Sequence, residues 1–164
     1  MKKALLALLI SASITATAQT ASENDTQFAH SAMEQGLLEI RLAELVQTHA
    51  ASEEVKAHAK HMLEDHTKIN DGLKDLAAKK NISLPASVTE AEQKIYDEMT
   101  KLNGKSFDKK YAKYMISSHN KAIGLYKRQA RTGDDAELLS WAFQTVPILE
   151  HHREMWKEAC KKIK

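Results

Sequence analysis

Cysteine, proline, glycine and aromatic residues are all scarce in this sequence. Its 164 residues include one cysteine, Cys160, so no disulfide can form within the chain. The five glycines are scattered, which excludes a glycine-rich phosphate-binding loop. No alternating run of β-branched residues occurs, so no strands are expected. The apolar residues instead recur at spacings of three and four, which predicts an all-α fold.

An excess of charge of either sign is also missing. The chain has 24 basic and 22 acidic residues, a formal net charge of +2. Two of the basic residues, Lys2 and Lys3, lie at the extreme N-terminus, and without them the two signs balance. Nucleic-acid binding calls for a clustered positive surface, so we expect no nucleic-acid partner.

The N-terminus has the pattern of an export signal. Lys2 and Lys3 precede an apolar run over residues 4–10, and a small-x-small motif follows. This pattern predicts a signal peptide over residues 1–18 and a single domain over residues 19–164. Beyond it, no apolar run is long enough for a membrane span, which needs about 20 residues. We therefore expect an exported protein, periplasmic or secreted, whose oligomeric state, homo-oligomers included, and protein partners the sequence leaves open.

Periodicity and capping signals predict four long helices and one short helix. The long helices are expected over residues 25–49, 52–79, 106–131 and 134 to the C-terminus, and the short one over 87–102. The predicted N-caps are Ser52, a capping box from Ser87 to Glu90, Ser106, and Asp134 with Glu137. Pro147 should kink the last helix. The prediction is a four-helix bundle with a short extra helix in the crossover between the second and third long helices.

A histidine interrupts the apolar stripe of the second helix. That stripe consists of Val55, Ala59, Met62, His66, Ile69, Leu73 and Leu76. An imidazole buried without a partner costs about 1–3 kcal/mol, so His66 needs a hydrogen-bond or ligand partner. Glu39 lies on the stripe of the first helix, where carboxylates are rare. His119 lies on the third stripe, and either His151 or His152 lies on the fourth.

Three of these polar residues should lie at the same depth along the bundle axis. Counted from the turns at about 1.5 Å per residue, Glu39, His66 and His119 fall near the middle of their helices, and His152 lies further off. Imidazoles with one carboxylate suit zinc, iron or copper. We therefore predict a transition-metal site formed by Glu39, His66, His119 and His152. Asp65 and Tyr126 are the expected outer partners of these ligands.

Three alternatives stay open at this point. The polar cluster could only fix the register of a structural or stress-associated bundle through hydrogen bonds between His and Glu39. An enzyme could use His66 with Asp65 or Glu39 as an acid–base pair, but this requires a pocket that reaches His66, and we lean against it. A weaker surface metal pair is His58 with His61, three residues apart on one helix face.

Several short motifs carry a family resemblance over nearly the whole predicted domain. They are Asp25-x-x-Phe28, Leu38-Glu39-Ile40, Val55-Lys56, Met62-x-x-Asp65-His66-Thr67, Leu84-Pro85, Phe107-Asp108-x-x-Tyr111, Met115-x-x-x-His119 and Val146-Pro147-x-Leu149-x-x-His152. With them the chain is similar to the ferritin-like family catalogued as domain of unknown function 4142, often labelled an outer membrane protein. The resemblance implies an exported bacterial ferritin-like four-helix bundle. It also favours His152 over His151 as the inward residue.

The resemblance does not extend to di-iron chemistry. Carboxylate-bridged di-iron bundles carry a Glu three residues before each ligand histidine on two of their helices. The residues at that position before His66, His119 and His152 are Leu63, Ile116 and Leu149. Ferroxidase or oxygen-activating di-iron activity is therefore not expected.

Overall fold

The protein is described by a computed structural model that covers residues 21–163. Five helices make up this part of the chain, and it contains no strand, which confirms the predicted all-α class. They are α1 (Glu23–His49), α2 (Glu53–Lys79), α3 (Glu90–Met99), α4 (Gly104–Thr132) and α5 (Ala136–Lys162). The predicted signal peptide, residues 1–18, lies outside the described residues. Within residues 21–163, no helix is long and apolar enough to cross a membrane.

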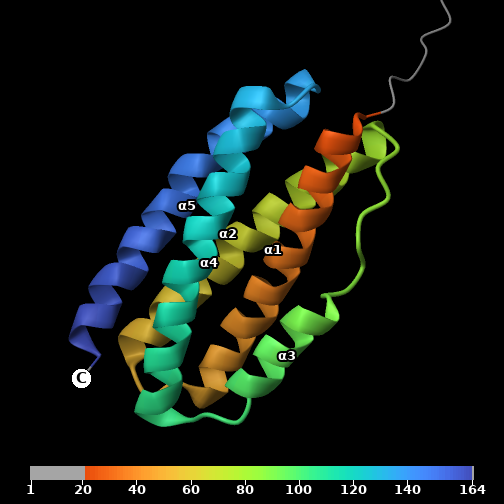
Figure 1. The fold of residues 1–164 in the computed structure, drawn as a ribbon. Coiled ribbons are helices and arrows are strands. Elements are labelled where there is room, and N and C mark those ends of the chain that lie inside the picture. Colours follow the sequence, from red (N-terminus) through yellow and green to blue (C-terminus); the bar gives the residue numbers. More distant parts are fainter. Residues whose placement is uncertain (1–20, 164) are drawn as a thin grey trace, which may run out of the picture.

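The four long helices form a bundle of two helical hairpins, α1–α2 and α4–α5 (Figure 1). α1 also packs against α4, and α2 packs against α5. After α2, the chain returns along the outside of the bundle to the end where α2 begins, so α4 runs in the same direction as α2 (Figure 1). α3 lies on this return path against α1 and α4. The predicted bundle with a short helix in the crossover is confirmed at this level, whereas the ferritin-like class stays a prediction.

The predicted N-cap of α2 is confirmed, and that of α3 is wrong by two residues. The Ser52 side chain accepts a hydrogen bond from the backbone N–H of Val55, as expected for the start of α2. The capping box of α3 was predicted two residues too early, because Thr89 and Glu92 form it. The motif S/T-x-x-E occurs twice in overlapping registers here, and sequence alone does not choose between them.

The caps of α4 and α5 were also predicted incorrectly. α4 begins at Gly104 without a side-chain cap, and the Ser106 hydroxyl donates to the backbone carbonyl of Asn103. α5 is capped by Asp135, whose carboxylate accepts from two backbone N–H groups of the first turn, rather than by Asp134. The backbone at this point also contacts a distant helix, as described next. α5 continues through Pro147 as one helix.

Two buried aspartates fix the ends of the hairpins. Asp108, in the first turns of α4, accepts hydrogen bonds from the backbone N–H groups of Ala51 and Ser52, at 3.2 and 3.0 Å. These two groups belong to the α1–α2 turn, so α4 holds the turn of the other hairpin. The Asp108 side chain is buried, and its charge is balanced by donors rather than by water.

Asp25, in the first turn of α1, does the same for the α4–α5 turn. Its carboxylate accepts from the backbone N–H groups of Asp134 and Asp135, at 3.3 and 2.9 Å, and from the side chain of Gln129. Asp25 thus holds the backbone of both residues just before α5, which begins at Ala136 with Asp135 as its N-cap. Each hairpin thus supplies the buried anion that closes the other hairpin's turn.

The apolar core consists of two clusters separated by polar residues. The cluster near the α1–α2 turn includes Leu42, Val55, Met62, Phe107, Tyr111, Met115 and Trp156. The cluster near the α4–α5 turn includes Phe28, Met33, Leu73, Ala122, Tyr126, Leu138 and Leu149. On each long helix, the change from one cluster to the other falls beside one of the predicted site residues. The bundle therefore carries a polar layer at mid-height.

Replacing Asp108 with alanine should destabilise the fold by about 2–4 kcal/mol, because two hydrogen bonds to a charged acceptor are lost at a buried turn. Urea denaturation monitored by circular dichroism measures this change. The matched control is Asp75→Ala, which removes an exposed aspartate from α2 and should change stability by less than about 0.5 kcal/mol. Equal effects of the two substitutions would contradict the role given to Asp108.

Candidate metal centre

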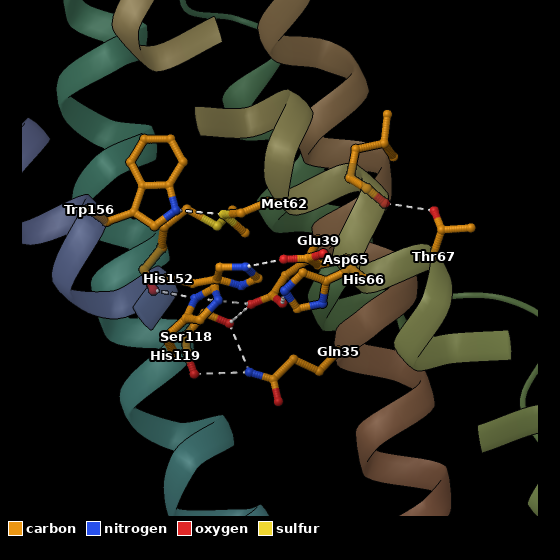
Figure 2. Close-up of polar contacts among 12 residues, drawn as sticks. Gln35, Glu39, Met62, Asp65, His66, Thr67, Ser118, His119, His152 and Trp156 are labelled. Atoms are coloured by element: carbon orange, nitrogen blue, oxygen red, sulfur yellow. Dashed lines mark hydrogen bonds and ion pairs between the residues drawn. The ribbon is translucent and has the colours of Figure 1, made fainter. Parts of the chain in front are cut away.

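Each of the four long helices contributes one buried ionisable side chain to the polar layer. Glu39 comes from α1, His66 from α2, His119 from α4 and His152 from α5, and none is more than 3 % exposed (Figure 2). The structure thus brings together the residues predicted from spacing. It also places His152 inward and His151 outward, an alternative that spacing left open.

The three imidazoles surround a common point. Their ring centroids lie 5.6 Å (His66–His119), 5.4 Å (His66–His152) and 5.5 Å (His119–His152) apart. One nitrogen from each ring lies within 4.8 Å of the other two. Three atoms so spaced all lie within about 2.8 Å (4.8 Å divided by √3) of some point, whereas Zn–N bonds measure about 2.0–2.1 Å. A small inward movement of each ring would therefore suffice for coordination.

Hydrogen bonds hold two of these rings with one nitrogen free. His119 Nδ1 donates to the backbone carbonyl of Met115 at 2.9 Å, which leaves Nε2 as the ring nitrogen without a hydrogen-bond partner. His152 Nε2 donates to the carboxylate of Asp65 at 3.1 Å, which leaves Nδ1 free. Both free nitrogens are buried and have no hydrogen-bond partner among the described residues. Metal-ligating histidines are oriented in this way, by a carbonyl or a carboxylate on the other nitrogen.

The third free nitrogen is Nε2 of His66. It lies 3.1 Å from Glu39 Oε2, but the two groups are not aligned for a hydrogen bond, so this nitrogen too is unpartnered. Glu39 itself is held by Ser118, whose hydroxyl donates to Oε1 at 2.7 Å. Gln35 in turn donates to the Ser118 oxygen at 2.8 Å (Figure 2). Glu39 is therefore a fixed anion beside the three imidazoles, and it stands outside the group of three converging nitrogens.

Electrostatics favours a cation at this place. Burial alone would raise the pKa of Glu39, but His119, His66 and the hydrogen bond from Ser118 together lower it, so the carboxylate is ionised. Burial lowers the pKa of His66 and lowers that of His152 to about 4, which leaves both rings neutral at pH 7. A buried anion beside neutral imidazoles is costly unless a cation accompanies it. Either a proton shared within the cluster or a bound metal ion can fill this role.

The predicted outer partners have different outcomes. Asp65 orients one of the predicted ligands, His152, through a hydrogen bond of 3.1 Å. Tyr126 packs edge-on against Phe28, with ring centroids 5.2 Å apart, and no hydrogen bond joins it to an imidazole in the part of the chain that the structure describes. Burial raises its pKa, so it is a neutral phenol. Tyr126 therefore belongs to the apolar core beside the site rather than to its polar partners.

Sequence reasoning missed the polar residues that support the layer. Neither Ser118 nor Gln35 was among the predicted site residues. Asn70 is 2 % exposed, and its side-chain amide lacks a partner within residues 21–163. It lies one turn after His66, a spacing that could have signalled it. Gly36 of α1 lies opposite Asn70 of α2, and a Cβ atom at position 36 would overlap the Asn70 amide.

A small cavity adjoins the layer on the side of α1 and α2. Its lining includes Glu39, His66, Asn70 and Tyr126, and its volume is about 10 Å³. This space holds about one water molecule. The acid–base hypothesis required a pocket that reaches His66, and this cavity is too small to admit an organic substrate.

The fold and the site together define a helical bundle with a buried histidine cluster. The chain belongs to the family described as "Domain of unknown function (DUF4142)", whose model matches residues 11–159. The crystal structure of a DUF305 fragment from Deinococcus radiodurans is similar, with a TM-score of 0.77 and 10 % identity, and the match covers 87 % of this chain and 99 % of that chain. At this identity the likeness concerns the fold alone. None of the curated proteins matches the chain.

The metal-free protein should lose stability as the pH falls from about 6.5 to about 4. His152 has a lower pKa folded than unfolded, so the unfolded chain binds more protons in this window and is favoured there, by about 1.4 kcal/mol per pKa unit. Urea denaturation at a series of pH values in EDTA measures the slope.

In the His152→Gln variant the slope should be shallower, because a group that protonates only on unfolding is gone. The neighbouring exposed residue supplies the control: His151→Gln should keep the wild-type slope. Equal wild-type stability at pH 7 and pH 5 would contradict the burial of neutral imidazoles.

Proposed function

We propose that this protein binds one transition-metal ion through His66, His119 and His152, with Glu39 as the nearby compensating anion. The single observation behind the proposal is that three buried imidazoles, each with a nitrogen that lacks a hydrogen-bond partner, place one nitrogen apiece within 4.8 Å of the other two. Each such atom costs about 1–3 kcal/mol if it stays unsatisfied, and a metal ion would satisfy all three at once. Ligands from three helices around a bundle core are also a recurrent way in which bundle proteins bind metals.

The alternative, a cluster that only fixes the register, accounts less well for these atoms. A register device works through hydrogen bonds that one arrangement satisfies and others do not. Here Glu39 accepts from Ser118 and lies 3.1 Å from His66, but the free nitrogens of His119 and His152 are buried without a hydrogen-bond partner among the described residues. This arrangement favours a bound cation over a closed network of hydrogen bonds.

The donor set indicates zinc, copper(II) or iron rather than a soft monovalent ion. Three imidazoles and a carboxylate are borderline ligands that these metals accept. The thioether of Met62, in the adjoining apolar cluster, accepts a hydrogen bond from the Trp156 indole (Figure 2). A nitrogen-rich centre with one open position is therefore the proposed site, and binding rather than catalysis is the proposed activity. The export predicted from residues 1–18 belongs to this proposal.

Apo protein titrated with Zn²⁺ should bind one ion per chain, and His66→Ala should lower the affinity by more than about 100-fold. Loss of an outer partner of a ligand already costs about 10–100-fold, and His66 is a direct ligand in this proposal. Isothermal titration calorimetry measures both values. His30→Ala, which removes an imidazole bonded only to the Ser83 carbonyl, should bind like the wild type. No binding by the wild type, or unchanged binding by His66→Ala, would refute the proposal.

Bound metal should also stabilise the fold. At a free Zn²⁺ concentration 100 times the dissociation constant, the free energy of unfolding should rise by about 2.7 kcal/mol, and EDTA should reverse the gain. Thermal denaturation with and without Zn²⁺ measures the effect. If metal and chelator both leave the melting temperature unchanged, the register role becomes the better description of the cluster.

A further inference from the structure

A second group of ligand-type atoms lies between the buried centre and the surface. It consists of Nε2 of His61, Oδ2 of Asp65 and Nε2 of His152, all within 4.8 Å of one another. Asp65 Oδ2 lies 3.4 Å from the His61 nitrogen and 3.1 Å from that of His152. A nitrogen–oxygen–nitrogen set of this kind suits a divalent transition ion. We call it the outer group.

Exposure falls steadily from the outer group to the buried centre. The side chain of His61 is 48 % exposed, that of Asp65 21 %, and that of His152 is fully buried. His61 and Asp65 are four residues apart on α2 and therefore share one face of the helix. His152 of α5 closes the gap between this face and the bundle interior. The exposed ring of His151 also lies beside His61, with centroids 6.1 Å apart.

His152 faces the two groups with its two different nitrogens. Nε2 is hydrogen-bonded to Asp65 of the outer group, whereas Nδ1 is buried and has no hydrogen-bond partner among the described residues. A neutral imidazole carries one proton and one free lone pair, so only one of these nitrogens can bind a metal at a time. His152 therefore belongs to both groups but can bind a metal ion in only one of them at a time.

We propose that the outer group is the loading site through which a divalent transition ion reaches the buried centre. This inference rests on the proposed function. The ion first binds His61, Asp65 and Nε2 of His152, while the His152 proton resides on Nδ1. When the ion moves inward to Nδ1, the proton moves to Nε2, where the Asp65 carboxylate accepts it in a hydrogen bond. His152 keeps one proton throughout, and no oxidant or reductant is involved.

The surroundings of His61 distinguish it from the other surface histidine of the same helix. His58 Nε2 lies 3.6 Å from Glu54 and its ring packs edge-on against Trp156, so it faces the other way along α2. The sequence paired His58 with His61 as a surface metal site, but the structure pairs His61 with Asp65 instead. Lys68 approaches the other carboxylate oxygen of Asp65, at 3.8 Å, and leaves Oδ2 to the two histidines.

The experiment measures the rates of Co²⁺ binding by the full-length apo protein and of Co²⁺ release to EDTA in a stopped-flow spectrometer. Wild type is compared with His61→Ala, and His58→Ala serves as the control because it removes a surface imidazole from the same helix. In His61→Ala both rates should fall by the same factor, about tenfold or more, since a loading site lowers the barrier without changing the end states. The equilibrium dissociation constant should stay within about twofold. His58→Ala should match the wild type.

Each other outcome overturns a defined part of the inference. If His61→Ala loads and releases Co²⁺ at wild-type rates, the loading role is wrong while the buried centre stands. If only release becomes faster and affinity falls, His61 is a ligand of the final site. If the wild type binds no Co²⁺, Zn²⁺ or Cu²⁺, the proposed function and the loading site both fail. Circular dichroism of His61→Ala checks that this exposed substitution leaves the fold intact.

Discussion

The structure depends on the burial of one ionised carboxylate, Glu39, among neutral imidazoles in the middle of an apolar bundle. Above and below this layer the core is hydrophobic and Glu39 is buried, so bulk water does not reach the charge. Ser118 donates one hydrogen bond to Glu39, and the carboxylate otherwise interacts electrostatically with the three imidazole rings. A buried anion of this kind favours a cation nearby, and the three rings each place one nitrogen within 4.8 Å of the other two. The proposed metal binding and the stability of the fold would thus follow from the same arrangement.

The rigidity of this arrangement comes from the ends of the bundle. Asp25 and Asp108 each close the turn of the opposite hairpin, which fixes how far α1 and α4 can slide past their partners. A slide of one residue moves a side chain by about 1.5 Å along the axis, which is enough to separate ligands that must meet within a fraction of that distance. These aspartates lie far from the polar layer. Through the register of the helices, they nevertheless position the histidines.

Local pattern in the sequence was sufficient for the helices and for the inward residues, but not for the contacts made between distant segments. His66 could be placed because apolar neighbours at three- and four-residue spacing define its face, and tight turns gave its depth relative to Glu39. Asp25 and Asp108 appeared only as parts of motifs, because their partners are backbone N–H groups of turns more than fifty residues away. Ser118 was missed because a small hydroxyl residue beside His119 gives no signal until α1 is placed against α4. Overlapping capping signals also misplaced the starts of α3 and α5 by one or two residues.

The fold that this chain shares with a DUF305 fragment at 10 % identity leaves the chemistry of the layer to its own side chains. The central claim is that His66, His119 and His152 bind one ion together. Crystals of the protein soaked in Zn²⁺ and measured at the zinc absorption edge test it most directly. We predict an anomalous peak inside the bundle, about 2.0–2.2 Å from one nitrogen of each ring. Anomalous peaks confined to surface residues, with the three rings still unliganded, would contradict it.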